Sequence, residues 1–316
     1  MLSLGIDYEA GQWKLAAWNE DRAADLLVFD SEAGVWDSVE DILTAHPAAP
    51  IVLPSGFGIP VTRAGELLDR DIAEITLRRE AHVTDPLGQF LAEARRRSLR
   101  AFCIPAVRLL PSIPLHRKLN RVDLGTADVL CAAVWAIHCL AQGERDLAPS
   151  NFVLLHLGAG TRALLAIRDG RIVDGIGRSS GGMGVASRAA ADGLMASLGR
   201  GVGRSRDVGE MENIQVRLRE AKKQAFWETV EKESASLLAF HGLSQVVVTG
   251  PGSAEVIQAT GDHLPVVLLP TLVDGHEAAL GAALIAAGLT GGPTANLVTH
   301  LELRQARERV LDWIVP

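Results

Sequence analysis

One pattern occurs twice in this sequence, and it restricts the possible folds more than any other feature. An apolar run, a short glycine-containing turn and a second apolar run occupy residues 4–29 (LGIDYEAGQWKLAAWNEDRAADLLVF) and again residues 154–176 (LLHLGAGTRALLAIRDGRIVDGI). Each copy predicts a strand, a glycine turn and a returning strand. When the copies are aligned, Asp7 matches His156 and Gly11 matches Gly160. Because the copies lie about half a chain apart, we expect two similar domains that face one another across a cleft.

Elsewhere, short apolar runs bounded by glycine and proline alternate with helical patterns. The runs at 51–58 and 245–253 are examples, and a helix is predicted over residues 126–143. This alternation indicates an α/β fold, which we divide into domains 1–148 and 149–316. Residues 301–314 also predict a helix, which could pack back on the body or form part of a homodimer contact.

Charge and hydropathy exclude several classes of function. The chain has 31 basic and 38 acidic residues, so no broad cationic surface is expected and we predict no nucleic-acid partner. Its apolar stretches fall short of the roughly 20 residues needed to cross a bilayer, and the N-terminal residues lack the pattern of a secretory signal. Three cysteines without metal-ligand spacing are typical of a reducing cytoplasm. We therefore expect a cytoplasmic protein with no membrane partner.

The glycine turns themselves suggest a chemistry. Consecutive backbone N–H groups in such a turn form a concave anion site, and glycine lets a phosphate approach without a side chain in the way. A single glycine turn is also simply a common hairpin. Two such turns directed into one cleft, however, could bind a polyphosphate.

These residues resemble a known superfamily, that of the sugar kinases, acetate kinase, actin and the heat-shock chaperone ATPases, with its two phosphate loops and later adenosine loop. Residues 156–160, HLGAG, are similar to the His-Leu-Gly-x-Gly second phosphate loop of acetate and butyrate kinases. Four blocks, IVLPSGFGIPVTR, LPSIPLHRKLNRVDLGTADVLCAAVWAI, DGIGRSSGGMG and GHEAALGAALIAAGL, resemble the family of predicted butyrate kinases over nearly the whole chain. The resemblance implies two ribonuclease-H-like (actin-like ATPase) domains facing a nucleotide cleft, with ATP and Mg²⁺ as cofactors.

The resemblance also implies roles for individual residues. His156 would contact the phosphoryl group in flight, and Asp7 would organise the Mg²⁺ ion and its waters, although an Asp at this place could merely start a turn. The first turn departs from the superfamily because YEAGQWK lacks the usual Ser or Thr. The candidate nucleotide-binding residues are Gly5, Asp7, Gly11, Gly158, Gly160, Thr161, Gly250, Gly252 and Ser253.

Further candidates concern the phosphoryl acceptor. Asp123 could orient or deprotonate it, whereas Asp128 either shares that role or complements a helix dipole. The basic run at 116–121, which includes Arg117, could face an anionic substrate or form a solvated loop. Arg178 and the neighbouring residues 179–181 are expected near the cleft.

Together these residues predict an ATP- and Mg²⁺-dependent phosphotransferase for a small anionic acceptor. The resemblance to acetate and butyrate kinases favours a short-chain carboxylate, and a hydroxyl acceptor stays open. The alternative is an actin-like ATP-binding module that regulates a partner without a phosphorylated product, which the altered first turn favours. A paralogue that has lost nucleotide binding is a third interpretation, against which the retained turn at 156–160 argues.

Overall fold

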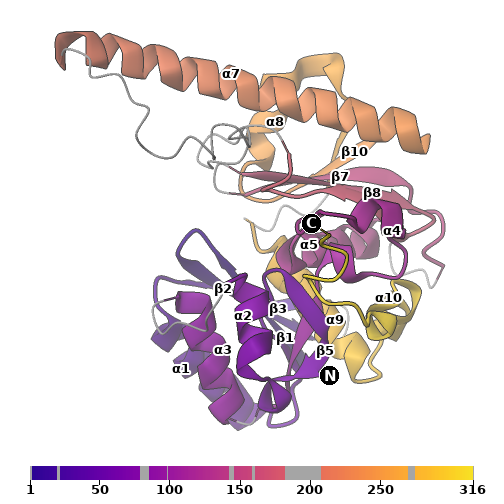
Figure 1. Cartoon of the computed structure of the whole chain (residues 1–316). Coiled ribbons are helices and arrows are strands. Elements are labelled where there is room, and N and C mark those ends of the chain that lie inside the picture. Colours follow the sequence, from indigo (N-terminus) through magenta and orange to yellow (C-terminus); the bar gives the residue numbers. More distant parts are fainter. Residues whose placement is uncertain are drawn as a thin grey trace.

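Two mixed sheets form the framework of the protein (Figure 1). The computed structural model describes residues 2–19, 22–78, 85–97, 99–141, 146–158, 161–181, 208–269 and 275–315. The first sheet has the order β3-β2-β1-β4-β6-β5 and the second β11-β10-β7-β8-β9. The strands are β1 Leu2–Glu9, β2 Gln12–Asn19, β3 Arg22–Phe29, β4 Ile51–Val52, β5 Gly58–Arg63, β6 Ala101–Pro105, β7 Phe152–Leu157, β8 Arg162–Arg168, β9 Arg171–Ile176, β10 Val246–Thr249 and β11 Val266–Leu268.

The two sheets share one topology. In the first, β1, β2 and β3 form an antiparallel meander, and β4 and β6 follow parallel to β1. In the second, β7, β8 and β9 form the meander, and β10 and β11 follow parallel to β7. The structure therefore confirms the internal repeat and the α/β class. The boundary at residue 148 stays a prediction, and the two sheets are built from residues on either side of it.

The tight hairpins follow from their turn residues. Ala10 and Gly11, between β1 and β2, have φ of +53° and +88°, and Asp169 and Gly170, between β8 and β9, have φ of +50° and +69°. Two consecutive residues with positive φ make the turn whose twist matches that of paired strands. Glycine at the second position adopts this backbone without steric cost.

Helices pack around and between the sheets. They are α1 Glu32–Ala45, α2 Asp69–Thr76, α3 Pro86–Arg97, α4 Leu115–Lys118, α5 Ala127–Ala141, α7 Val208–His241, α8 Ser253–Thr260, α9 Glu277–Leu289 and α10 Ala295–His300, with short 3₁₀ turns η1 Ala64–Glu66, η2 Val107–Leu109, η3 Gly261–His263 and η4 Leu303–Gln305. Helix α5 confirms the helix predicted at 126–143. One end of α7 projects beyond the rest of the molecule in Figure 1. No helix in the described ranges is long and apolar enough to span a membrane.

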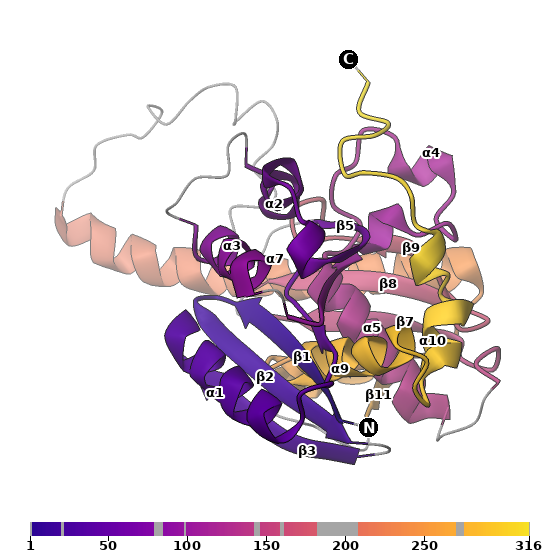
Figure 2. The same ribbon diagram turned by 90° about the horizontal axis from the view of Figure 1, so that it is seen from below.

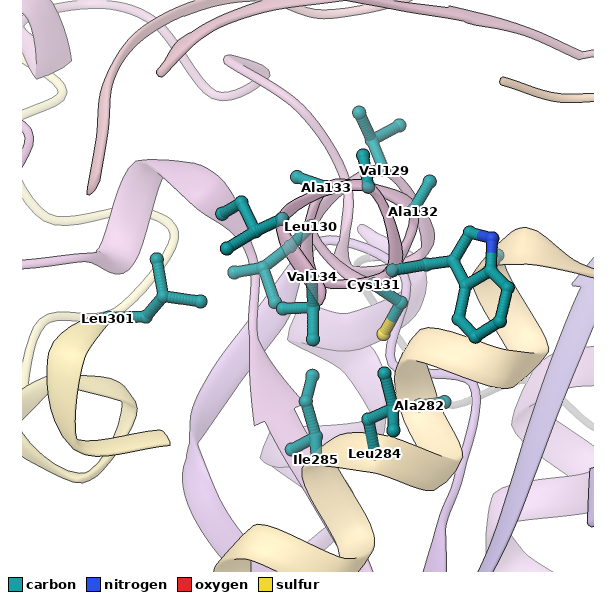
Figure 3. Close-up of a cluster of buried hydrophobic side chains, with 14 of the residues drawn as sticks. Val129, Leu130, Cys131, Ala132, Ala133, Val134, Ala282, Leu284, Ile285 and Leu301 are labelled. Carbon is teal, nitrogen blue, oxygen red and sulfur yellow. The ribbon is translucent and has the colours of Figure 1, made fainter. Parts of the chain in front are cut away.

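Helices α5 and α9 form the centre of the core (Figures 2 and 3). Every residue of α9 is buried, and the helix packs against both α5 and β1. A Cβ on Gly5 would lie 1.9 Å from the carbonyl oxygen of Ala279, and one on Gly281 would lie 1.8 Å from that of Cys131. These glycines let the backbones approach closely, so the packing of β1 on α9 requires a glycine at position 5. The nucleotide-binding role predicted for Gly5 stays a prediction.

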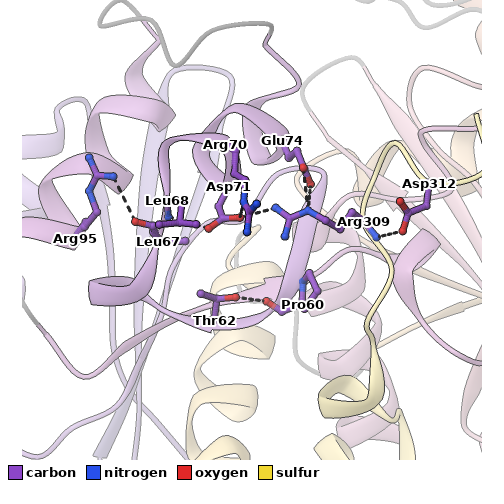
Figure 4. A network of polar contacts seen from close by, with 10 residues as sticks. All are labelled: Pro60, Thr62, Leu67, Leu68, Arg70, Asp71, Glu74, Arg95, Arg309 and Asp312. Atoms are coloured by element: carbon purple, nitrogen blue, oxygen red, sulfur yellow. Dashed lines mark hydrogen bonds and ion pairs between the residues drawn. The ribbon is translucent and has the colours of Figure 1, made fainter.

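The helix predicted at 301–314 is wrong. Helix α10 ends at His300, and only the short η4 turn follows. The reason lies in two arginines, Arg108 and Arg309, of which Figure 4 shows Arg309 with its partners on α2. The buried guanidinium of Arg108 donates to the backbone carbonyls of Arg309 and Asp312, and Arg309 pairs with two carboxylates of α2. These contacts hold residues 309–312 against the body, where the Arg309 carbonyl accepts from Arg108 and from the N–H of Asp312 in an isolated turn that does not continue as a helix.

Candidate functional site

Three loops meet where β1, β7 and β10 end. A Cβ on Gly158 would lie 2.0 Å from the Oε1 atom of Glu9, so the end of β7 touches the end of β1. Gly250 has φ of +93°, and its Cβ would lie 2.2 Å from the carbonyl oxygen of Leu157. The backbone N–H of Gly252 donates to that same carbonyl over 3.3 Å. The two turns of the sequence repeat and the β10–α8 loop therefore converge on one place.

A pocket of about 730 Å³ opens at this junction. Its walls include Lys14 from the first hairpin, Gly158 and Gly252 from the second sheet, and Lys223 and Trp227 from α7. The volume lies within the range of sites for drug-sized ligands and cofactors. Of the predicted nucleotide residues, the structure brings Gly158 and Gly252 to this pocket, and Gly11 lies between two further wall residues. Gly160 lies outside the described residues.

A second pocket, of about 110 Å³, lies next to the first, one step back along β1. Asp7 and Tyr8 line it, whereas Glu9 and Ala10, the next residues along the chain, line the larger pocket. Its other polar walls are Ser55, Thr126, Asp128 and Arg178, and the remaining walls are mostly aliphatic. The end of β1 therefore separates a large pocket from a small one.

A cluster of charged side chains joins the two pockets. The Nη2 atom of Arg178 lies 2.6 Å from Oδ2 of Asp128 and 3.1 Å from Oε1 of Glu9. The Nζ atom of Lys14 lies 3.8 Å from Oε2 of Glu9 and donates to the carbonyl oxygen of Gly275 over 2.8 Å. Burial alone would raise the pKa of Asp128, but the Arg178 guanidinium holds it below its usual value. Asp128 therefore stays ionised.

Asp7 has the opposite titration behaviour. The residue is only 5% exposed. Burial, followed by the negative charges of Asp128 and Glu9, raises its pKa from 3.8 to about 7. Lys14 and Arg178 oppose this shift without cancelling it. An added cation near Asp7 would favour its ionised form.

His156 lies deep in the same cluster and is 3% exposed. Its Nδ1 atom is 3.0 Å from the hydroxyl of Thr249. Burial lowers the pKa of His156, so the imidazole is neutral at pH 7 and presents one N–H donor. Glu277, 2% exposed, accepts a hydrogen bond from the backbone N–H of Gly250 through Oε1 over 3.2 Å. Its buried Oε2 has no hydrogen-bond partner among the described residues.

The described residues of the site form no ready-made metal cage. Among the residues that the structure describes, no group of three or more His, Cys, Asp or Glu side chains is placed to hold a metal ion. Mg²⁺ does not need such a group, because it commonly binds through one or two carboxylates, waters and substrate phosphates. The role of Asp7 as a magnesium residue stays a prediction.

The structure places Asp123 beside the small pocket and not in its wall. The carboxylate accepts hydrogen bonds from the backbone N–H and the hydroxyl of Ser179, at 2.9 and 2.7 Å, and from the N–H of Gly125. A Cβ on Gly177 would lie 1.8 Å from its Oδ1 atom. Asp123 thus fixes the turn that carries Arg178. The catalytic role predicted for it stays untested, and Asp128 is the carboxylate that lines the pocket.

The basic run at 116–121 does not line either pocket. Arg117 donates to the carbonyl oxygen of Val173 over 2.5 Å, and its Nε atom is 3.3 Å from Asp174. Lys118 is buried and pairs with Glu308 at 2.6 Å. Two nucleotide candidates also lie just behind the walls. Ser253 begins helix α8, and the hydroxyl of Thr161 is buried next to Gly158 without a described partner.

Sequence reasoning missed three residues of this cluster. Glu9 follows Asp7 by two positions in one strand, so the period of a strand places both on one face. Thr249 lies opposite His156 in the parallel pairing of β10 with β7. Glu277 is the first residue of α9. Of the three, only Glu9 has a signal in the sequence, namely the strand period.

The duplicated sheets, with loops meeting at the ends of β1 and β7, define the class: the chain has the actin-like ATPase fold. It belongs to the family described as protein of unknown function (DUF1464), which matches residues 31–316. Acetate kinase from Entamoeba histolytica is similar in structure, with a TM-score of 0.55, 13% identity, and coverage of 82% of this chain and 84% of that one.

Two further solved structures are more distant. The ROK hexokinase from Thermus thermophilus has a TM-score of 0.44 and 16% identity, with coverage of 90% of this chain and 98% of that one. A ROK family glucokinase from Streptomyces griseus has a TM-score of 0.45 and 13% identity, with coverage of 90% and 99%. No curated protein matches the chain in sequence. At these identities the likeness concerns the fold alone.

Proposed function

We propose that this protein is an ATP- and Mg²⁺-dependent phosphotransferase whose acceptor is a small anion of the short-chain carboxylate class. One observation carries the proposal. A pocket of about 730 Å³ and a pocket of about 110 Å³ lie next to one another along the end of β1, with buried charges between them. A phosphoryl donor and a small acceptor placed in these pockets would meet at that cluster. Such placement is the main requirement of phosphoryl transfer.

The larger pocket suits a nucleotide. Gly158 and Gly252 let phosphates approach the backbone, and Lys14, Arg219 and Lys223 supply positive charge among walls that also carry Glu9, Glu220 and Glu255. The smaller pocket has room for only a few non-hydrogen atoms beside Arg178 and its aliphatic walls. Asp7 and Asp128 share this wall, so a carboxylate acceptor would bind beside Arg178 with Asp7 protonated or neutralised by a cation, and the short apolar wall favours a short chain.

The residues present fit a magnesium ion. Glu277 has a buried carboxylate oxygen without a described partner, which is costly unless a ligand satisfies it. Asp7 keeps a pKa near 7 in the absence of a cation. We assign these two carboxylates to the Mg²⁺ ion, which when bound would neutralise charge on the transferring phosphate.

The protein's own side chains would position the reacting groups and stabilise the charge that develops during transfer. A carboxylate oxygen of the acceptor attacks the γ-phosphorus of ATP, the bond from that phosphorus to the bridging oxygen breaks, and ADP leaves with that oxygen. A carboxylate is already ionised, so no general base is needed. Arg178 would stabilise charge on the transferring group, and Asp128 would hold Arg178 in place. The neutral His156 would donate its N–H to a phosphoryl oxygen.

One observation favours a second candidate, the ATP-binding module without a phosphorylated product. Arg178 already pairs with Glu9 and Asp128, and the Glu9 carboxylate lies against Gly158, where a phosphate would approach. The first turn offers no serine or threonine hydroxyl. Such a site could bind nucleotide and signal its occupancy to a partner.

The deciding experiment combines calorimetry with turnover. Mg²⁺-dependent ATP binding would be measured for the wild type, His156→Ala and Arg178→Gln, with Arg168→Gln at an exposed site as the matched control. ADP release would then be followed with linear carboxylates of increasing length and the corresponding alcohols. The proposal expects one short carboxylate to accelerate ADP release. This accelerated rate should fall about 100-fold in each site variant and stay unchanged in the control. ATP binding without any accepted substrate would favour the regulatory module, and no ATP binding would refute both.

A further inference from the structure

A third cavity, of about 640 Å³, lies apart from the two pockets of the proposed kinase site. Three arginines from three separate segments line it. Arg63 ends β5, Arg100 immediately precedes β6, and Arg304 lies in η4. Val61, Phe102 and Leu289 contribute apolar wall. The cavity therefore combines several guanidinium groups with an apolar surface.

This cavity lies toward the other end of the first sheet. In the strand pairing, Arg63 of β5 lies opposite Phe102 of β6, and Phe102 lies opposite Val52 of β4. Val52 in turn lies opposite Gly5 of β1, whereas the charged cluster begins further along β1, at Asp7. Helix α9 shows the same separation. Its first residue, Glu277, belongs to the proposed kinase site, and its last residue, Leu289, lies in the cavity wall. The helix spans roughly 18 Å between those ends. The cavity is thus neither the donor nor the acceptor pocket.

These three arginines are solvent-exposed, and no described carboxylate balances their charges. Arg95, Arg97, Arg162, Arg178 and Arg309 each pair with a carboxylate, whereas Arg108, Arg121 and Arg168, like the cavity arginines, have no ion pair in the described part of the chain. In the described part of the chain, no carboxylate lies within ion-pair distance of Arg63, Arg100 or Arg304, although acidic residues outnumber basic ones by 38 to 31. Glu66 is the single acidic residue among the described residues of the wall.

The remaining hydrogen-bonding capacity is large. Arg100 donates to the carbonyl oxygen of Ala48 over 3.0 Å, and Arg304 donates to that of Leu289. Each guanidinium has five N–H donors in a planar fork, so most donors of both stay available. The guanidinium of Arg63 has no hydrogen bond or ion pair among the described residues. Like charges gathered in one cavity repel, and an anion bound between them would relieve that repulsion.

We propose that this cavity is a second ligand site, for a small organic anion that carries a phosphate or carboxylate group on an apolar body. The guanidinium groups bind the anionic group, which matches their planar fork, and the Val61, Phe102 and Leu289 surface contacts the apolar part. The site is independent of the kinase proposal, because none of its residues belongs to either pocket at the end of β1.

The test uses the full chain and the dye 8-anilinonaphthalene-1-sulfonate, an anion with an apolar body whose fluorescence rises on binding. Titrations are made with and without the ATP analogue AMPPNP and Mg²⁺, so that binding in the large pocket is recognised by its competition. The variants are Arg63→Gln, which breaks no described contact, and Arg304→Gln. Arg307→Gln, an exposed site three residues from Arg304 and outside the cavity wall, is the matched control.

We expect saturable dye binding that AMPPNP does not displace, weakened about tenfold by each of the two cavity variants and unchanged by the control. Hexyl phosphate and hexanoate then compete for the dye, and the stronger competitor identifies the anionic group. Equal dye affinity in all variants, or displacement by AMPPNP alone, would overturn the proposal. So would the failure of both competitors. None of these readouts requires ATP turnover, so failure of the kinase proposal is detected separately.

Discussion

Replacing Asp7 by asparagine should make the protein more stable, in a way that depends on pH. Burial and neighbouring carboxylates raise the pKa of Asp7 from 3.8 to about 7. Protonated Asp7 therefore stabilises the fold fully below pH 3.8, and this contribution declines with rising pH until it is lost above pH 7. At about 1.4 kcal/mol per pKa unit, ionised Asp7 costs the folded state about 4 kcal/mol.

Asparagine keeps the shape of the side chain and carries no charge. We expect Asp7→Asn to raise the free energy of unfolding by about 4 kcal/mol at pH 8 but by only about 1 kcal/mol at pH 4.5. Urea unfolding without nucleotide or Mg²⁺, followed by tryptophan fluorescence, measures both values. Asp41→Asn, at an exposed position of α1, controls for the loss of one negative charge. An equal gain at both pH values, or a loss at pH 8, would refute the electrostatic reasoning.

Three further substitutions test the packing and the site. Gly5→Ala places a Cβ 1.9 Å from the carbonyl oxygen of Ala279 and should cost about 3 kcal/mol in urea unfolding, whereas an unchanged midpoint would contradict the close packing of β1 on α9. Gly158→Ala places a Cβ 2.0 Å from Glu9 and should weaken ATP binding about tenfold, as measured by calorimetry. An unchanged ATP affinity would mean that this loop is not part of the nucleotide site. Arg309→Gln should speed chymotryptic cleavage of the C-terminal segment, and an unchanged rate would mean that other contacts hold it.

Much of the framework could be predicted from local sequence. The first hairpin needs two consecutive residues with positive φ, and Gly11 between two apolar runs is the sequence signal for that turn, whereas Ala10 gives none. Helix α5 follows from its apolar run next to Thr126. The C-terminal segment could not be predicted in this way. Its course depends on Arg108, about 200 residues earlier, which is a tertiary contact that overrides helical periodicity.

The site was only partly predictable for a similar reason. Asp7 and His156 end equivalent strands, so the repeat could identify them. Asp128 has an ordinary explanation as a first-turn acid of α5, and only the ion pair with Arg178 shows its place in the pocket wall. Glu277 becomes part of the site because the start of α9 meets the Gly250 loop. No spacing within the sequence encodes that meeting.

The position of α9 has a consequence for synthesis of the chain. Strand β1 packs on α9, and Gly5 contacts the backbone of Ala279, yet Glu277–Leu289 leaves the ribosome long after Leu2–Glu9. The first sheet can pair its strands early, because all six precede residue 106. The face of β1 that receives α9 stays uncovered until the second sheet has also been made. During translation that apolar face is therefore open to chaperones or to misassembly, and release of the finished helix is the event that closes it.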